Sequence, residues 1–247
     1  MSLFSKILLI LAVMPSVSLA QGLNFPMGDG ASFNGRAIQL IGLITVLSLA
    51  PGIIMMVTSF PLLITVFAIL RQAIGLQQSP PNMLIVSLAL FLTYFIMEPE
   101  FEDAWKLGLR PMIEETIDAE TGLLRAVEPF QNFMVVRTKQ NTIRTLADLR
   151  KNTIQTNSST DAASPSTPLS VLIPSFMLSE ISRAFQIGFI IFLPFLIIDL
   201  LVAAILMSMG MMMVPPAIVS LPFKLGFFVI VDGWSLIASS LVRSYSL

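Results

Sequence analysis

An uncharged apolar run from Ala37 to Leu70 is the feature that most constrains how this chain can fold. As one straight helix its residues would reach roughly 51 Å, whereas the hydrocarbon core of a bilayer measures about 30 Å. Pro51 and Pro61 divide the run. Irregular backbone at membrane depth survives only where protein or a water-filled cavity covers it. The run therefore predicts a kinked or broken membrane helix rather than one simple span.

The composition places the rest of the chain in or against a membrane as well. Of 247 residues, 55% are hydrophobic and only 12% are charged, and the mean hydropathy is +0.85, which is too apolar for an ordinary soluble domain. The net charge of -1 leaves no basic surface for a nucleic acid. The absence of His and Cys removes disulfides, thiolate and imidazole metal sites and the commonest general base. We therefore expect a membrane protein, and most classes of enzyme lack their catalytic groups in this chain.

Residues 1–20 have the order of a cleavable signal peptide. Lys6 precedes an apolar run over residues 7–13, and small residues lead to a cleavage site after Ala20. The alternative is a retained transmembrane helix, which the short apolar run disfavours. Cleavage would place residues 21–36 outside the cytoplasm as an exposed leader.

Two apolar segments flank a polar one. We expect a first kinked helical hairpin over residues 37–97, whose second arm, Met83–Met97, would be only roughly 22 Å long. Residues 98–156 hold most of the charged side chains and predict a small extracytoplasmic helical insertion. Residues 157–170 are typical of a flexible linker, and residues 171–247 predict a second kinked hairpin. The expected fold class is all-α, multi-helix and membrane-associated.

Within the insertion, Leu109–Pro111 is typical of a turn. Apolar side chains near helical spacing predict amphipathic helices over Leu123–Val136 and Thr142–Lys151. An acidic cluster at the start of the insertion suggests calcium ligands, but it lacks the spacing of a known loop, so a solvated surface is the preferred interpretation. The cluster consists of Glu98, Glu100, Glu102 and Asp103.

Five charged side chains interrupt the second apolar segment: Glu180, Arg183, Asp199, Lys224 and Asp232. A charge inside a membrane helix costs about 2.5–3.5 kcal/mol on insertion scales and usually faces protein or water. Two arrangements are open: Asp199 or Asp232 pairs with Lys224 within the chain, or the pairs form between subunits. All five residues are therefore candidates for intersubunit contacts. A proton-relay role for either aspartate is a further alternative.

Methionines gather in the segment Met207–Pro216, which holds five of the fifteen in the chain. Gly210 with the pair Pro215 and Pro216 predicts a hinge, at which one helix ends or kinks and the next begins. Unbranched thioether side chains can close a hole or mould around something that passes through it. The simpler alternative is that these methionines are filler in the core or against lipid.

Both apolar segments contain motifs that match those of a known protein family in the same order. Those of the first segment are Ile69–Gly75, Pro80–Asn82 and Leu88–Thr93; those of the second are Pro174–Phe176, Ala184–Gly188, Pro194–Leu200, Gly210–Pro216, Leu221–Lys224 and Val231–Trp234. Together they resemble the FliP family of flagellar and type III secretion export-gate proteins. The resemblance covers about Ser59–Pro99 and Ile173–Arg243 and is weak in between.

The resemblance implies a core subunit of the flagellar export gate in the bacterial inner membrane and flagellar basal body, with much of the chain on the periplasmic side. Several copies would assemble with FliQ and FliR into a helical ring around a channel for unfolded flagellar proteins, with FlhB and FlhA as further partners. Such a subunit is not an enzyme and has no cofactor. The family's methionine loop maps onto Met211, Met212 and Met213, with Met209 beside them, and would seal the closed channel. Glu180 and Lys224 resemble positions that join adjacent subunits by charge.

Two positions depart from the family pattern. Pro61-Leu62 stands where the family commonly has Thr-Arg, and Glu98 stands where a small residue is usual. Neither lies in the methionine loop. The rival hypothesis from another functional class is an ion-coupled secondary transporter that uses Asp199 and Asp232; such a protein would show internal repeats with broken helices that meet at a midplane site.

Overall fold

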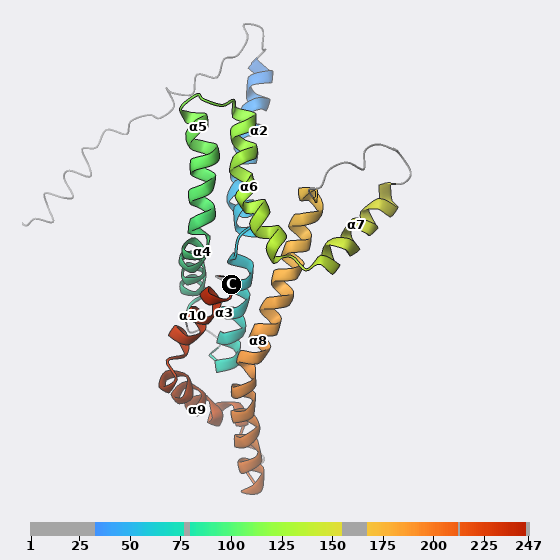
Figure 1. Ribbon diagram of the computed structural model, residues 1–247. Coiled ribbons are helices and arrows are strands. Elements are labelled where there is room, and N and C mark those ends of the chain that lie inside the picture. The colour runs from blue at the N-terminus through green and yellow to red at the C-terminus, as the bar shows by residue number, and fades with distance from the viewer. Residues whose placement is uncertain (1–32, 77–79, 155–166, 212, 246–247) are drawn as a thin grey trace, which may run out of the picture. The chain divides into compact units, whose positions relative to one another are not determined.

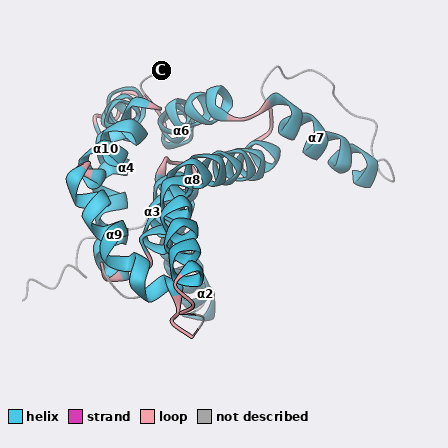
Figure 2. Ribbon diagram, turned by 90° about the horizontal axis from the view of Figure 1, so that it is seen from below, coloured by secondary structure: helices cyan, strands magenta, loops and turns pink. Residues whose placement is uncertain are grey.

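The computed structural model describes residues 33–76, 80–154, 167–211 and 213–245. Every regular element in these ranges is helical, as Figure 2 shows, which confirms the all-α class for this part of the chain. The signal peptide, the leader before residue 33 and most of the linker lie outside the described residues. The elements are α2 (Phe33–Met56), α3 (Phe60–Ile74), α4 (Asn82–Ala104), a π-helical turn η2 (Trp105–Leu109), α5 (Arg110–Ile113), α6 (Ala119–Arg137), α7 (Gln140–Ile154), α8 (Leu169–Ser208), α9 (Pro216–Ile230) and α10 (Gly233–Arg243).

The chain divides into two compact units, residues 1–49 and residues 50–247. The described part of the first unit is the larger portion of α2. The apolar side chains that are described on this portion are exposed, and those of Ile41 and Ile44 are exposed by 64% and 65%. Apolar surface of this extent requires lipid or another protein against it.

The uncharged run is broken as predicted, but between α2 and α3 rather than at Pro51. α2 ends at Met56 with Pro51 inside it, and α3 begins at Phe60. Pro61 lies in the first turn of α3, where its missing N–H removes no helical hydrogen bond. Pro51 lies inside α2 and removes one backbone hydrogen bond from it. The helix continues because an apolar environment favours helices, in which the other backbone groups are hydrogen-bonded.

The core of the second unit is built around α3. Leu63, Val66 and Phe67 are fully buried there, and α3 lies alongside α8 in Figure 1. Gly188 on α8 makes the close approach possible, because a Cβ atom at this position would lie only 2.5 Å from Cδ1 of Ile69. Small residues at such crossings let helices pack tightly where lipid provides no hydrophobic force between them.

The second arm of the first hairpin is longer than predicted. α4 does not end at Met97; it continues through the acidic cluster to Ala104, and with η2 and α5 it forms a helical stretch to Ile113. The turn predicted at Leu109–Pro111 is therefore wrong. The π-helical turn absorbs one extra residue per turn, and Pro111 falls in the first turn of α5, where proline is tolerated.

The insertion returns along this stretch as α6, which confirms the helix predicted over Leu123–Val136. Gly108 of η2 packs so closely on α6 that a Cβ atom there would lie 2.5 Å from the backbone nitrogen of Ala126. The side chain of Asp118 caps α6 by accepting a hydrogen bond of 3.2 Å from the backbone N–H of Thr121. α7 confirms the second predicted helix of the insertion.

Two helical stretches of the described chain are long and apolar enough to cross a membrane: Asn82–Ile113 and Leu169–Ser208. α9 and α10 together qualify as a third if the 60° bend between them is counted as part of one span. The described part of the chain thus holds two or three apolar helices of membrane-spanning length.

Candidate functional site

The methionine segment joins α8 to α9 through a turn that its sequence determines. Gly210 has φ 74, in the left-handed region that suits glycine. The N–H of Met211 donates to the carbonyl of Leu206 at 3.0 Å, and that of Gly210 donates to the carbonyl of Met207 at 3.0 Å. This pair of bonds is the Schellman arrangement that terminates a helix. Pro215 and Pro216 then start α9, where neither proline removes a helical hydrogen bond.

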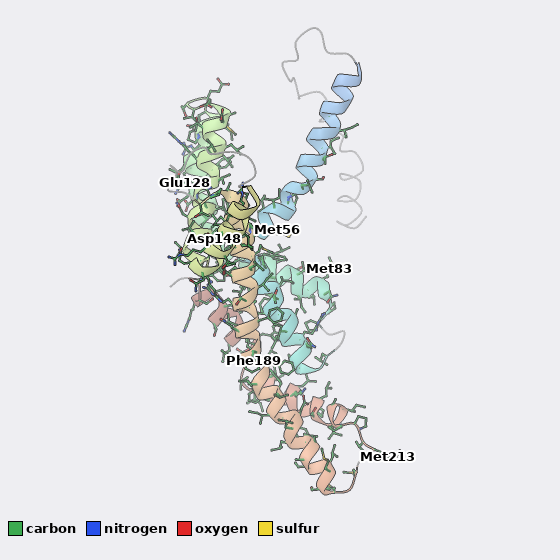
Figure 3. The ribbon with its side chains drawn as sticks, turned by 90° about the vertical axis from the view of Figure 1, so that its right-hand side faces the viewer. Met56, Met83, Glu128, Asp148, Phe189 and Met213 are labelled. Atoms are coloured by element: carbon green, nitrogen blue, oxygen red, sulfur yellow. The ribbon has the colours of Figure 1, made fainter. Side chains whose placement is uncertain are left out.

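The side chains of this turn contact little of the chain. Met209 is exposed by 65% and Met213 by 98%, and Met211 is also exposed; Met212 lies outside the described residues. Figure 3 shows Met213 at the tip of the α8–α9 pair. We call residues 209–214 the methionine loop. Met209 and Met213 present soft apolar side chains that the described part of the protein leaves largely uncovered.

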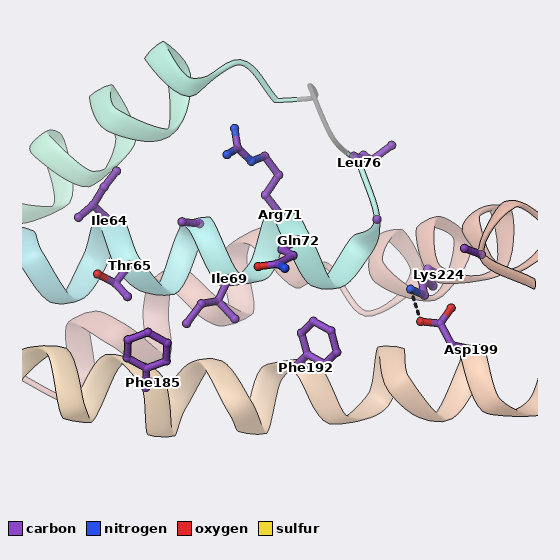
Figure 4. A pocket seen from close by; sticks show the side chains of 13 residues that line it. Ile64, Thr65, Ile69, Arg71, Gln72, Leu76, Phe185, Phe192, Asp199 and Lys224 are labelled. Atoms are coloured by element: carbon purple, nitrogen blue, oxygen red, sulfur yellow. Dashed lines mark ion pairs between the residues drawn. The ribbon is translucent and has the colours of Figure 1, made fainter.

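Asp199 and Lys224 form an ion pair at the base of this loop (Figure 4), with 2.6 Å between Oδ2 and Nζ. Ser220, which is fully buried, donates its hydroxyl to Oδ1 of Asp199 at 2.5 Å. Lys224 also donates to the backbone carbonyl of Ala73 at 3.2 Å, near the end of α3. A cation there suits the partial negative charge of a helix C-terminus. This Asp199 cluster ties α3, α8 and α9 together.

A second cluster surrounds Glu180, whose side chain is fully buried on α8. Its Oε1 lies 3.6 Å from Nε of Arg137 and 3.5 Å from Nη1 of Arg183, and its Oε2 accepts a hydrogen bond from the hydroxyl of Tyr245. Arg137 also stacks over the Tyr245 ring and donates to the carbonyl of Ser244 at 2.7 Å. Burial first, and then the Glu180 carboxylate, raise the pKa of the Tyr245 hydroxyl. This Glu180 cluster ties α6, α8 and the segment after α10 together.

The structure brings four of the five predicted charged residues into these two clusters. Asp199 pairs with Lys224 within the chain, and Arg183 pairs with Glu180. Asp232 differs: it is exposed at the start of α10 with φ 49, and it has no ion-pair partner among the described residues. Pairing between subunits remains a prediction for all five.

Three further members of these clusters were not predicted from the sequence: Arg137, Tyr245 and Ser220. Ser220 could have been found, since it precedes Lys224 by four residues and so shares its helix face. Arg137 and Tyr245 meet Glu180 only through the tertiary fold, because they lie on other elements far away in the chain.

An open groove of about 950 Å³ lies beside the Asp199 cluster, between α3, α8 and α9 (Figure 4). Phe185 and Phe192 of α8 and Ile69 of α3 form apolar walls, and Arg71 stands at the rim with its guanidinium bonded to the Asn82 side chain. In the described ranges, no three acidic side chains converge in a way that could hold a metal ion.

Comparison with known proteins gives a consistent result. A model of the FliP family matches residues 43–241. The flagellar biosynthetic protein FliP of Caulobacter vibrioides is 47% identical over 235 residues, covering 95% of this chain and 86% of the relative. The protein of the same name from Rhizobium meliloti is 45% identical over 247 residues and 98% of both chains. That of Bacillus subtilis is 43% identical over 208 residues, covering 84% of this chain and 91% of the relative. The residues matched by the family model include the methionine loop, Glu180 and Asp199.

Proposed function

Because the chain belongs to the FliP family, we propose that it is a core channel subunit of the flagellar type III export gate and that its methionine loop seals the closed channel. It is a membrane protein of flagellar biosynthesis and not an enzyme. The exported cargo would be unfolded flagellar proteins. The partner subunits would be FliQ and FliR, with FlhB and FlhA beside them.

The exposed methionine loop is the observation that carries this proposal. Two apolar helices lead to a turn whose side chains point away from the core, and Met213 is almost fully exposed. A ring of copies would bring several such loops together at one constriction. A dry apolar constriction excludes ions, and flexible thioether side chains can deform around a polypeptide.

The need for neighbours also supports a ring. Large apolar side chains are exposed along α8, among them Phe185, Phe189 and Ile197, and the adjoining groove is open. Apolar surface on this scale marks contact with lipid or other subunits. Within this arrangement, Glu180 and Lys224 would serve the subunit contacts indirectly, by fixing the helices that form them. Arg183, Asp199 and Asp232 retain exposed atoms that a neighbouring subunit can reach.

The insertion would lie on the periplasmic side of the inner membrane. This orientation rests on the predicted signal peptide at residues 1–20, which would place the mature N-terminus outside the cytoplasm. Asp199 does not support the transporter hypothesis, because one of its carboxylate oxygens pairs with Lys224 and the other accepts a hydrogen bond from Ser220.

The test replaces Met211, Met212 and Met213 with Ala in cells that depend on this protein for flagella. We expect ion leakage with an intact, assembled complex, because three shorter side chains leave the constriction open. The matched control replaces Met55, Met56 and Met83, exposed methionines outside the loop. Normal export without leakage in the loop variant, or equal leakage in the control, would show that the loop is not the seal.

A further inference from the structure

The Asp199 cluster lies where it can control the methionine loop. We propose that Asp199, Ser220 and Lys224 form a clasp that positions the loop by holding its two arms together at the base. This inference rests on the proposed function, and it assigns to these residues a positioning role within one chain that is separate from any contact between subunits.

The clasp brackets the loop from both sides. Asp199 lies on α8 about ten residues before the loop, and Ser220 and Lys224 lie on α9 about six and ten residues after it. The two contacts to Asp199 are short, at 2.6 Å and 2.5 Å, so they fix the separation and the rotation of the two arms. Both α9 residues of the clasp are buried.

A third contact anchors the clasp to the core. Nζ of Lys224 donates to the carbonyl of Ala73, which is fully buried near the end of α3. Gly75, with φ 90, ends α3 so close that a Cβ atom there would lie 3.9 Å from that same Nζ. The arms are therefore fastened to the most enclosed helix of the second unit as well as to each other.

Between the clasp and the loop the contacts between the two arms are apolar. An apolar groove of about 410 Å³, open to the surface, runs along them; Val202, Ile205 and Leu206 line it from α8, and Val219 and Phe223 line it from α9. Apolar contacts are weakly directional and do not by themselves fix how two helices are rotated. The arms can therefore shift against one another near the loop, while the clasp holds their base. If the clasp is released, the loop loses its defined position.

The chain contains no cysteine, so one introduced cysteine can carry a spin label at a single site. We would label Met213→Cys at the loop tip and, separately, Phe189→Cys, which is exposed on α8 on the other side of Asp199. Mobility of the label would be measured in the assembled complex with and without Asp199→Asn. Ion leakage would be measured in the cysteine-free background, so that the label does not disturb the seal.

We expect Asp199→Asn to increase label mobility several-fold at position 213 and to leave it unchanged at position 189, with increased ion leakage. The matched control is Glu102→Gln, which removes an exposed ion pair of the same length, 2.6 Å to Lys106, and should change neither site. Ser220→Ala removes one hydrogen bond and keeps the ion pair, so it should give a smaller increase at position 213 alone.

The readouts separate the clasp from the seal. Unchanged mobility at position 213, or an equal change at positions 213 and 189, would overturn the clasp. Increased mobility at position 213 alone, without leakage, would support the clasp and count against the loop as the seal. If Asp199→Asn does not assemble, Ser220→Ala decides the same question: an assembled complex with an unchanged signal at position 213 would overturn the inference.

Discussion

Two acidic residues on one helix, Glu180 and Asp199, organise their surroundings in different ways. The side chain of Glu180 is fully buried, yet its two arginine contacts are long, at 3.6 Å and 3.5 Å. The side chain of Asp199 is exposed by 33%, yet its contacts to Lys224 and Ser220 are short. The deeper cluster thus has the looser ionic geometry.

The charges of the two clusters explain this difference. Glu180 faces two guanidinium groups, so that cluster carries one surplus positive charge, whereas Asp199 and Lys224 balance. Nε and Nη2 of Arg137 are buried without a hydrogen-bond acceptor, and Oε1 of Glu180 has no hydrogen-bond donor. A buried charge that loses its partner costs more than the pair contributed. We therefore expect the Glu180 cluster to be the more sensitive one to substitution, despite its longer distances.

Glu180→Gln should have the largest effect. It leaves two arginines near each other with no anion, and Arg137 is only 12% exposed. Breaking a buried pair in this way destabilises by about 3–5 kcal/mol. The measurement is the thermal unfolding midpoint of the purified complex in detergent. A midpoint within error of the unsubstituted protein would show that water, not Glu180, compensates the arginines.

Asp199→Asn should come next, with a loss of about 1–3 kcal/mol, because it strands the ammonium group of Lys224. The double variant Asp199→Asn with Lys224→Met should be less destabilised than the sum of the single variants, since no charge remains unpaired. The same unfolding assay gives all three values. Additive losses would mean that the 2.6 Å contact contributes no coupling.

These clusters also show what the sequence could predict. The pairing of Asp199 with Lys224 was one of the two arrangements that the sequence left open, and Gly210, Pro215 and Pro216 lie at the predicted end of one helix and start of the next, because those signals are local. The partners of Glu180 were not predictable, since Arg137 and Tyr245 reach it only after α6 and α10 have folded back.

Helix ends were predicted less well where tertiary packing overrode a local proline signal. Pro51 and the segment Leu109–Pro111 carry proline signals for a break, but both remain helical. At Leu109–Pro111 the chain stays helical because a π-helical turn accommodates the proline and Gly108 packs closely on α6. Such packing depends on a partner helix and leaves no mark on the local sequence.

Tyr245→Phe should destabilise less than Asp199→Asn, by about 1.5 kcal/mol at neutral pH. This is the lower end of the range for a hydrogen bond to a charged group, because the two arginines still compensate the charge of Glu180. It also tests the pH dependence of the Glu180 cluster. The folded state raises the pKa of Tyr245 above the ordinary value of 10.0, so its contribution is complete below that pH and is lost as the pH rises further.

Unfolding measured from pH 8 to pH 11 should therefore show a steeper alkaline loss of stability in the unsubstituted protein than in Tyr245→Phe. The comparison between the two proteins cancels the titration of lysines and of Tyr94, the other tyrosine in the chain. Parallel curves would indicate that the Tyr245 hydroxyl is hydrated and that the Glu180 cluster is more open than the structure shows.

Glu102→Gln should have the smallest effect and sets the scale for the others. Glu102 and Lys106 form an ion pair of 2.6 Å, as short as that of Asp199, but both side chains are more than half exposed. Exposed pairs one helical turn apart contribute only about 0.3–0.5 kcal/mol, because water solvates the separated charges almost as well. The unfolding midpoint should hardly change, and raising the salt concentration should remove what difference there is. A loss as large as that of Asp199→Asn would mean that contact length, not burial and charge balance, determines how much an ion pair matters in this protein.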